Sequence, residues 1–186
     1  MIIDTTLLKT PSEEMQDDSI KEPIIHKQEV ILIGSDHRGF NLKAILKKHL
    51  IDLQYDVMDH GTHNKDRCDY PPVAKSLIKT LTSDEDAVSK KGMLICGKGI
   101  LICGSGFGMS ITANRLKGIH AVVPRSVEEC RKARLHGNVN VLCIGTDFTT
   151  DVESVKIVDT FLNTAFEELE TSRYSQRIRM IDNPLW

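Results

Sequence analysis

The stretch VILIGSDHRGF, residues 30–40, decides the fold. Its first five residues form a continuous β-branched and apolar run, which is typical of a strand buried on both faces. A polar turn follows, and then a helical pattern with one face at positions i, i+3, i+4, i+7 and i+8. That face consists of Leu42, Ile45, Leu46, His49 and Leu50. The stretch therefore predicts a buried strand that feeds an amphipathic helix.

The same cycle recurs along the chain. Further strands are predicted at 55–58, 100–103, 119–123 and 140–145, and helices at 70–81, 108–116 and 127–135. A last helix carries Val155, Val158, Leu162, Ala165 and Phe166 on one face. Short apolar strands that alternate with amphipathic helices predict a Rossmann-like three-layer α/β sandwich, with a five-stranded parallel sheet and helices on both faces.

Composition limits the possible partners. Residues 1–28 show no sustained period and are interpreted as a flexible extension, which leaves 29–186 as a single domain. A formal charge of -2 gives no reason to expect nucleic acid or a membrane surface as a partner. The five cysteines include no CxxC pair, which favours reduced thiols in a cytoplasmic protein. We also expect no membrane span, because no apolar run reaches the roughly 20 residues required.

Two loops at predicted strand ends contain candidate binding residues, because ligands of such sheets bind outside the carboxyl ends of the strands. Asp36 and His37 follow the first strand, where a helix N-terminus favours an anion; the alternative is a helix-capping Asp and a solvated His. Gly104, Gly106 and Gly108 follow the third strand. Glycines there let backbone amides converge on an oxyanion or phosphate.

A near-repeat precedes that glycine loop. LICGKG at 94–99 is followed by LICGSG at 101–106, so Cys96 and Cys103 compete for a chemical role. Only the second copy leads into a helix start, where a lowered thiol pKa would make Cys103 a base or nucleophile. The alternative is a small buried hydrophobe, which is the role assigned to Cys130 and Cys143. The first copy is interpreted as an insertion that forms a loop or hairpin before the strand.

Other polar residues lie away from these loops. His136 and Asn138 come just before the last strand, normally the wrong edge for a site. Arg173 and Arg177 are four residues apart, so a helix would present them together, as an anion grip or as a solvated basic face. A third group, His60, His63 and Cys68, fits no strong zinc spacing, so no metal is expected.

The motifs GSDHRGF, DHGTHNKDRCDYPPVA, GILICGSGFGMSITANR, GIHAVV, NVLCIG and SRYSQR occur in this order. Together they resemble the type B ribose-5-phosphate isomerases and the related galactose-6-phosphate isomerase subunits, over about residues 31–180. The resemblance implies interconversion of ribose 5-phosphate and ribulose 5-phosphate without a cofactor. It also implies a homodimer, with a tetramer as the alternative, in which the sites lie between subunits and the C-terminal helix packs on the partner.

The resemblance also implies roles for individual residues. Cys103 would move a proton between C1 and C2 through a cis-enediol, and Ser105 would help to shuttle the hydroxyl proton. His136, with Gly137 beside it, would open the sugar ring. The remaining substrate and phosphate contacts would come from Asp36, His37, Gly104, Gly106, Phe107, Gly108, Arg173 and Arg177.

Three departures from the family pattern leave alternatives open. Gly137 stands where many relatives have Asn, Asp147 stands where many have Arg, and relatives lack the duplication. An acid at position 147 is expected to repel a phosphate, so replacing it with Arg is expected to improve the Michaelis constant. The alternatives are a galactose-6-phosphate or allose-6-phosphate isomerase and a catalytically weakened sugar-phosphate-binding protein.

Overall fold

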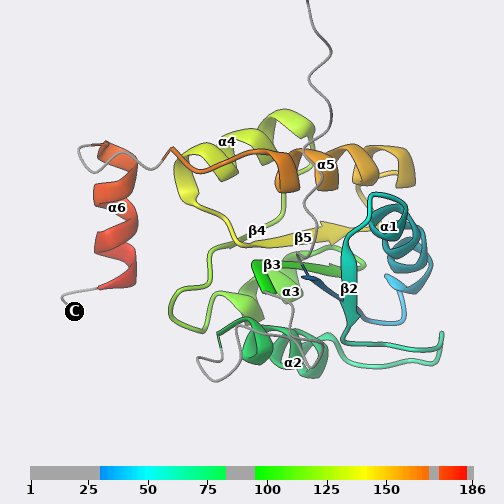
Figure 1. The fold of residues 1–186 in the computed structure, drawn as a ribbon. Coiled ribbons are helices and arrows are strands. Elements are labelled where there is room, and N and C mark those ends of the chain that lie inside the picture. Colours follow the sequence, from blue (N-terminus) through cyan, green and yellow to red (C-terminus); the bar gives the residue numbers. More distant parts are fainter. Residues whose placement is uncertain (1–29, 83–94, 168–171, 184–186) are drawn as a thin grey trace, which may run out of the picture.

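The computed structural model of the chain describes residues 30–82, 95–167 and 172–183. These residues form a five-stranded parallel sheet with helices on both faces (Figure 1). The strands are β1 (Val30–Ser35), β2 (Asp56–Asp59), β3 (Ile95–Cys103), β4 (Ala121–Val122) and β5 (Val141–Gly145). The helices are α1 (Phe40–Asp52), α2 (Tyr70–Thr82), α3 (Phe107–Ala113), α4 (Val127–Gly137), α5 (Asp151–Asn163) and α6 (Arg173–Asp182).

The strand order is β2-β1-β3-β5-β4. Helices α1, α4 and α5 cover one face of the sheet, and α2 and α3 cover the other (Figure 1). The helices that follow β1 and β5 therefore lie on one face of the sheet, and the helix that follows β3 lies on the other. Connections that diverge from neighbouring parallel strands open a crevice at the carboxyl ends of those strands. The tip of β3 lies between two such divergences, so this topology positions the candidate site there.

The central strands are buried on both faces, as the sequence predicts. In β1, Ile31 and Ile33 pack with α1, α4 and α5, while Val30 and Leu32 pack with α2 and α3. The same alternation holds in β3 and β5. Successive side chains of a strand point to opposite faces, so these runs contribute to both hydrophobic layers at once. The predicted five-stranded α/β architecture is confirmed.

The first copy of the repeat was expected to form a loop or hairpin, and this expectation is wrong. Its residues from Ile95 onward belong to β3 itself. Val30 pairs with Ile95 and Leu32 pairs with Gly99, so β3 advances by four residues where β1 advances by two. A β-bulge absorbs the extra length, and Gly97 in it has a φ of 68°. The position of Leu94 and the Cys96 side chain lie outside the described residues.

Helix α6 lies beside the end of α4 and away from the sheet (Figure 1). Its packing on a second subunit stays a prediction, as does the single-domain boundary at residue 29, since residues 1–29 lie outside the described part of the chain. In the described ranges, no helix is sufficiently long and apolar to span a bilayer.

Candidate active site

The loop after β1 brings Asp36 to the tip of β3. The Asp36 amide donates to the Ile102 carbonyl (3.1 Å), which ties this loop to the neighbouring strand. One carboxylate oxygen of Asp36 accepts from the amides of Arg38 (2.9 Å) and Gly39 (3.1 Å) at the start of α1. The buried carboxylate thus holds the turn that leads into α1, whose N-cap is Gly39, so Asp36 is not the helix-capping residue that the sequence left open as an alternative.

His37 is oriented by the loop that follows β2. Its Nδ1 lies 3.0 Å from the carbonyl oxygen and 3.3 Å from the amide nitrogen of Cys68. The ring is therefore held through one nitrogen by the Cys68 backbone, and the side chain is half-buried. Cys68 contributes through its main chain.

His60 belongs to the group that the sequence raised as a metal site, with His63 and Cys68. Its Nδ1 lies 3.0 Å from the hydroxyl of Ser76. The described ranges contain no cluster of three or more potential metal-binding side chains.

Cys103 ends β3 and is buried, with 4% of its surface exposed. Its sulfur accepts a hydrogen bond from the Gly106 amide at 3.1 Å. Burial raises the pKa of this thiol; the amides of Gly106, Met109 and Ser105 oppose the rise, and the Asp36 carboxylate adds to it. The lowered pKa expected from the sequence is therefore wrong in direction, because loss of hydration outweighs the amide hydrogen bonds.

The glycines after Cys103 form a loop whose backbone packs closely against neighbouring residues. Gly106 has a φ of 78°, a conformation that L side chains avoid, and it is the N-cap residue of α3. The ring of Tyr70 lies where a side chain on Gly108 would stand, 2.5 Å from such a Cβ. The Ser105 hydroxyl accepts from the Phe107 amide (3.3 Å), just before α3. The loop amides are thus directed at the Cys103 sulfur and the Ser105 hydroxyl, the two groups to which the sequence assigns chemistry.

Two charged residues meet across this loop. Arg38 Nη2 donates to Asp147 Oδ1 at 2.5 Å, which joins the loops after β1 and β5. The Asp147 amide also donates to the Gly104 carbonyl at 2.9 Å. The acid at 147, which was expected to repel a phosphate, is paired with Arg38. Arg38 was not among the predicted site residues, because no sequence pattern marks a residue after β1 as the partner of one after β5.

The remaining predicted residues lie at the opposite edge of the sheet. His136 is in the last turn of α4, just before β5, and its ring stacks on Tyr174 of α6 with centroids 4.1 Å apart. Gly137 ends α4. Arg173 donates to the Tyr174 hydroxyl at 2.8 Å, and Arg177 is exposed one turn later. Within one chain, these residues do not join the site at Cys103.

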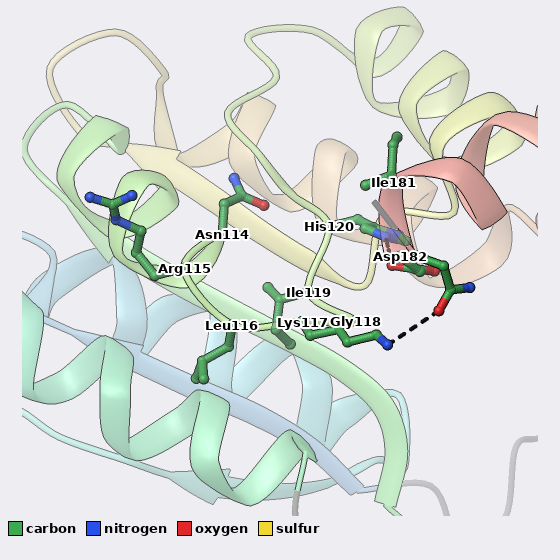
Figure 2. Close-up of a pocket in the computed structure, with 10 residues that line it drawn as sticks. Asn114, Arg115, Leu116, Lys117, Gly118, Ile119, His120, Ile181 and Asp182 are labelled. Atoms are coloured by element: carbon green, nitrogen blue, oxygen red, sulfur yellow. Dashed lines mark hydrogen bonds and ion pairs between the residues drawn. The ribbon is translucent and has the colours of Figure 1, made fainter. Parts of the chain in front are cut away.

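A cavity of about 500 Å³ also opens at this amino edge, between the α3–β4 connection and the end of α6 (Figure 2). His120 Nε2 lies 2.9 Å from Asp182 Oδ1, and Lys117 donates to Asn183 at 3.2 Å. These contacts anchor the C-terminal end of α6, while the His136–Tyr174 stack anchors its other end. The cavity does not include Cys103 or its glycine loop.

Comparison with known proteins gives consistent matches. The family model described as Ribose/Galactose Isomerase matches residues 31–181. A probable ribose-5-phosphate isomerase B of Mycoplasma genitalium is 39% identical, over 81% of this chain and 92% of its own length. Ribose-5-phosphate isomerase B of Escherichia coli is 36% identical, over 81% of this chain and 93% of its own length.

Solved structures agree with this result. The ribose 5-phosphate isomerase of Thermotoga maritima has a TM-score of 0.73 at 38% identity, covering 84% of this chain and 99% of its own. The Mycoplasma genitalium enzyme, solved with bound ribulose-5-phosphate, has a TM-score of 0.73 at 37% identity, covering 84% and 96%. The family predicted from the sequence motifs is confirmed: the chain belongs to the ribose/galactose isomerase family.

Proposed function

We propose that this protein interconverts ribose 5-phosphate and ribulose 5-phosphate through a cis-enediol. The observation that carries the proposal is the buried Cys103 thiol at the tip of β3, followed at once by a glycine loop whose amides approach the sulfur. Aldose–ketose isomerisation needs one base that moves a proton between two adjacent carbons and an environment that stabilises the enediolate. This loop can supply both.

Cys103 is the base in this proposal. The thiolate removes the proton from C2 of the aldose and returns it to C1, while amides of residues 104–108 stabilise the negative charge on the enediolate oxygen. Ser105 is the hydroxyl proposed to move the proton between O1 and O2. Asp36 and His37 bind the sugar hydroxyls from the neighbouring loop. Because burial raises the pKa of Cys103, the reactive thiolate is the minor form at neutral pH.

The complete site requires a second subunit. His136, proposed to open the sugar ring, and Arg173 and Arg177, proposed to grip the phosphate, lie at the amino edge of the sheet, away from Cys103. A twofold dimer can place the amino edge of one chain against the carboxyl edge of the other, and does so twice. The exposed guanidinium groups of α6 are then available to a partner's site.

Ribose 5-phosphate takes precedence over hexose 6-phosphates as the substrate. Relatives named for ribose 5-phosphate reach 36–39% identity, whereas a galactose-6-phosphate isomerase subunit of Clostridium acetobutylicum is 31% identical. The purified chain is assayed for ketose formation from ribose 5-phosphate, galactose 6-phosphate and allose 6-phosphate. Turnover of a hexose phosphate alone would contradict the substrate assignment. Absence of turnover with all three substrates would favour the alternative of a catalytically weakened sugar-phosphate-binding protein.

Mixing two inactive variants tests the shared site. Cys103→Ala and His136→Ala are each expected to abolish isomerisation, and Cys130→Ala is a matched control for loss of a buried thiol. Co-refolding the two inactive variants is expected to restore activity, since a mixed dimer regains one site with both residues. No restoration in a preparation shown to contain mixed dimers would contradict a site built from two chains.

A further inference from the structure

We propose that Arg38 is a substrate-binding residue that holds the phosphate of the sugar phosphate, and that Asp147 is the residue that positions it. The proposal rests on the proposed function and adds a phosphate contact from the same chain that supplies Cys103. It also assigns the acid at position 147 a supporting role in place of the repulsive one expected from the sequence.

The guanidinium group of Arg38 lies over the glycine loop. A Cβ built on Gly104 would lie 2.7 Å from Cζ and 3.1 Å from Nε of Arg38, so the group occupies the space that a side chain at 104 would need. Gly104 is the first residue after Cys103. A cationic fork is therefore placed beside the thiol and the amides that approach it.

Most donors of this fork are available to a ligand. Toward the described residues, the guanidinium makes one hydrogen bond, from Nη2 to Asp147. A guanidinium has five N–H donors in a planar fork, so Nε and Nη1 keep theirs for an anion. Asp147 restricts the orientation of the fork, because its own amide is bonded to Gly104 at 2.9 Å. A preorganised fork loses less entropy when it binds.

Exposure indicates which end of the substrate Arg38 meets. The Cys103 thiol is buried at 4% exposure, while the Arg38 side chain is 53% exposed at the rim of the same loop. If the reacting carbons lie at the thiol, the group at the rim is the far end of the sugar, which carries the phosphate. Phosphate oxygens are the partners that a planar guanidinium binds through two parallel hydrogen bonds.

A purely structural role explains the Arg38–Asp147 pair less well. Both side chains are substantially exposed, and exposed ion pairs contribute little to the stability of a fold. Replacing Arg38 is therefore expected to leave the melting temperature nearly unchanged. A loss confined to substrate affinity separates the two roles.

The experiment compares steady-state kinetics of Arg38→Met, Arg38→Lys and the control Arg131→Met, which removes an exposed guanidinium on α4. Arg38→Met is expected to raise KM for ribose 5-phosphate and Ki for inorganic phosphate about 10- to 100-fold, the loss of one or two charge-assisted hydrogen bonds. Its kcat should stay within about threefold, because the contact is made equally in ground and transition states. Arg38→Lys should recover part of the affinity, and Arg131→Met should match the unmodified chain.

Asp147→Asn provides an independent test through a double-mutant cycle. In the unmodified chain this change is expected to raise KM, because Arg38 loses its anchor. In the Arg38→Met chain it is expected to lower KM, because an unpaired carboxylate beside the phosphate is removed. If Asp147→Asn changes KM in the same direction in both chains, the positioning role of Asp147 is overturned.

Failure of the inference and failure of the proposed function give different results. If the unmodified chain turns over ribose 5-phosphate while Arg38→Met keeps its KM and its Ki for phosphate, the inference alone is overturned. If the unmodified chain has no turnover, the proposed function fails. Calorimetric titration with ribose 5-phosphate then tests Arg38: binding lost only in Arg38→Met supports the contact, and equal binding, or none by either chain, overturns it.

Discussion

Replacing Lys43 tests how much a buried charge holds the β2–α2 loop in place. Lys43 is buried on α1, and its ammonium donates to Asp59 (2.5 Å) and to the Thr62 carbonyl (2.7 Å). Lys47 also donates to Asp59, at 3.1 Å, and the Gly61 amide donates to it at 3.0 Å. Lys43→Met keeps the aliphatic volume and removes the charge, so Asp59 loses its most buried partner.

The expected loss follows from burial. Breaking a buried ion pair by removing one partner costs about 3–5 kcal/mol, and we expect the lower end because two donors to Asp59 remain. For a chain of this size, a loss of about 3 kcal/mol lowers the melting temperature by roughly 6–12 °C. Urea denaturation followed by circular dichroism gives the free energy of unfolding directly.

The same helix offers a matched control. Lys48 donates to Asp52 at the same 2.5 Å, but the two side chains are 77% and 58% exposed. An exposed pair four residues apart on a helix contributes about 0.3–0.5 kcal/mol, so Lys48→Met should cost no more than this. If Lys43→Met and Lys48→Met destabilise the fold equally, burial does not determine the strength of these pairs and the reasoning is refuted.

The cluster also has a pH signature. Burial opposes ionisation of Asp59, but the hydrogen bonds from Lys43, Gly61 and Lys47 outweigh it and lower the pKa of this carboxyl below its ordinary value. A carboxyl with a lowered pKa in the folded state stabilises the fold above its unfolded pKa, near 3.9, and this contribution disappears as pH falls through the folded pKa. Stability of Lys43→Met should therefore depend less steeply on pH below about 4.

Three further outcomes are expected. Because burial raises the pKa of Cys103, its alkylation by iodoacetamide, followed by mass spectrometry, and kcat/KM for ribose 5-phosphate should both keep rising with pH beyond pH 9; a plateau near neutrality would contradict this. Gly145→Ala should abolish folding or activity, since its Cβ would lie 2.5 Å from the Ser105 backbone, and a soluble, fully active variant would show that this loop yields easily. Tyr174→Leu should cost about 0.5–1.5 kcal/mol in thermal unfolding by removing the ring stacked on His136, and an unchanged melting temperature would argue against that contact.

The layers of the fold could be predicted from the sequence because the spacing of apolar residues determines which faces of each strand and helix are buried. Val30–Gly34 is apolar at every position, and only a strand covered on both faces can bury such a run. Helix ends were less certain, since they depend on local contacts: α3 ends at Ala113, three residues before the predicted end, where the Asn114 side chain bonds Ala121 of β4 instead.

The site could be predicted in part. The alternating pattern predicts parallel strands, so residues that follow a strand, such as Asp36 and Cys103, lie at one edge of the sheet, and His136, which precedes a strand, lies at the other. The pKa direction of Cys103 could not be predicted, because it is a balance between burial and amide hydrogen bonds that only coordinates reveal. The Arg38–Asp147 pair joins residues 109 positions apart, and no local pattern marks such a contact.

The repeat that competes with Cys103 in the sequence was also misjudged for a physical reason. Because only one copy can lead into the glycine loop, the other was expected to form a loop or hairpin. The strand instead extends back through it, and the Lys98 ammonium donates to the Leu162 carbonyl at 3.1 Å. That carbonyl belongs to the last turn of α5, where a cation is favourable. The extra segment therefore contacts the body of the protein and is no simple appendage.

The position of the bulge in β3 divides that strand into two parts with different tolerance to change. From Gly99 to Ile102 the strand is paired with both β1 and β5, and Cys103 is paired with Gly145 of β5, so this register fixes where the thiol lies. A Cβ built on Gly97 would meet no atom within 4 Å. The φ of 68° still favours glycine at position 97 itself. Because the paired segment stands between the bulge and the thiol, a change in chain length at the bulge is expected to leave Cys103 in register, so the central strand keeps its variable part apart from its chemical part.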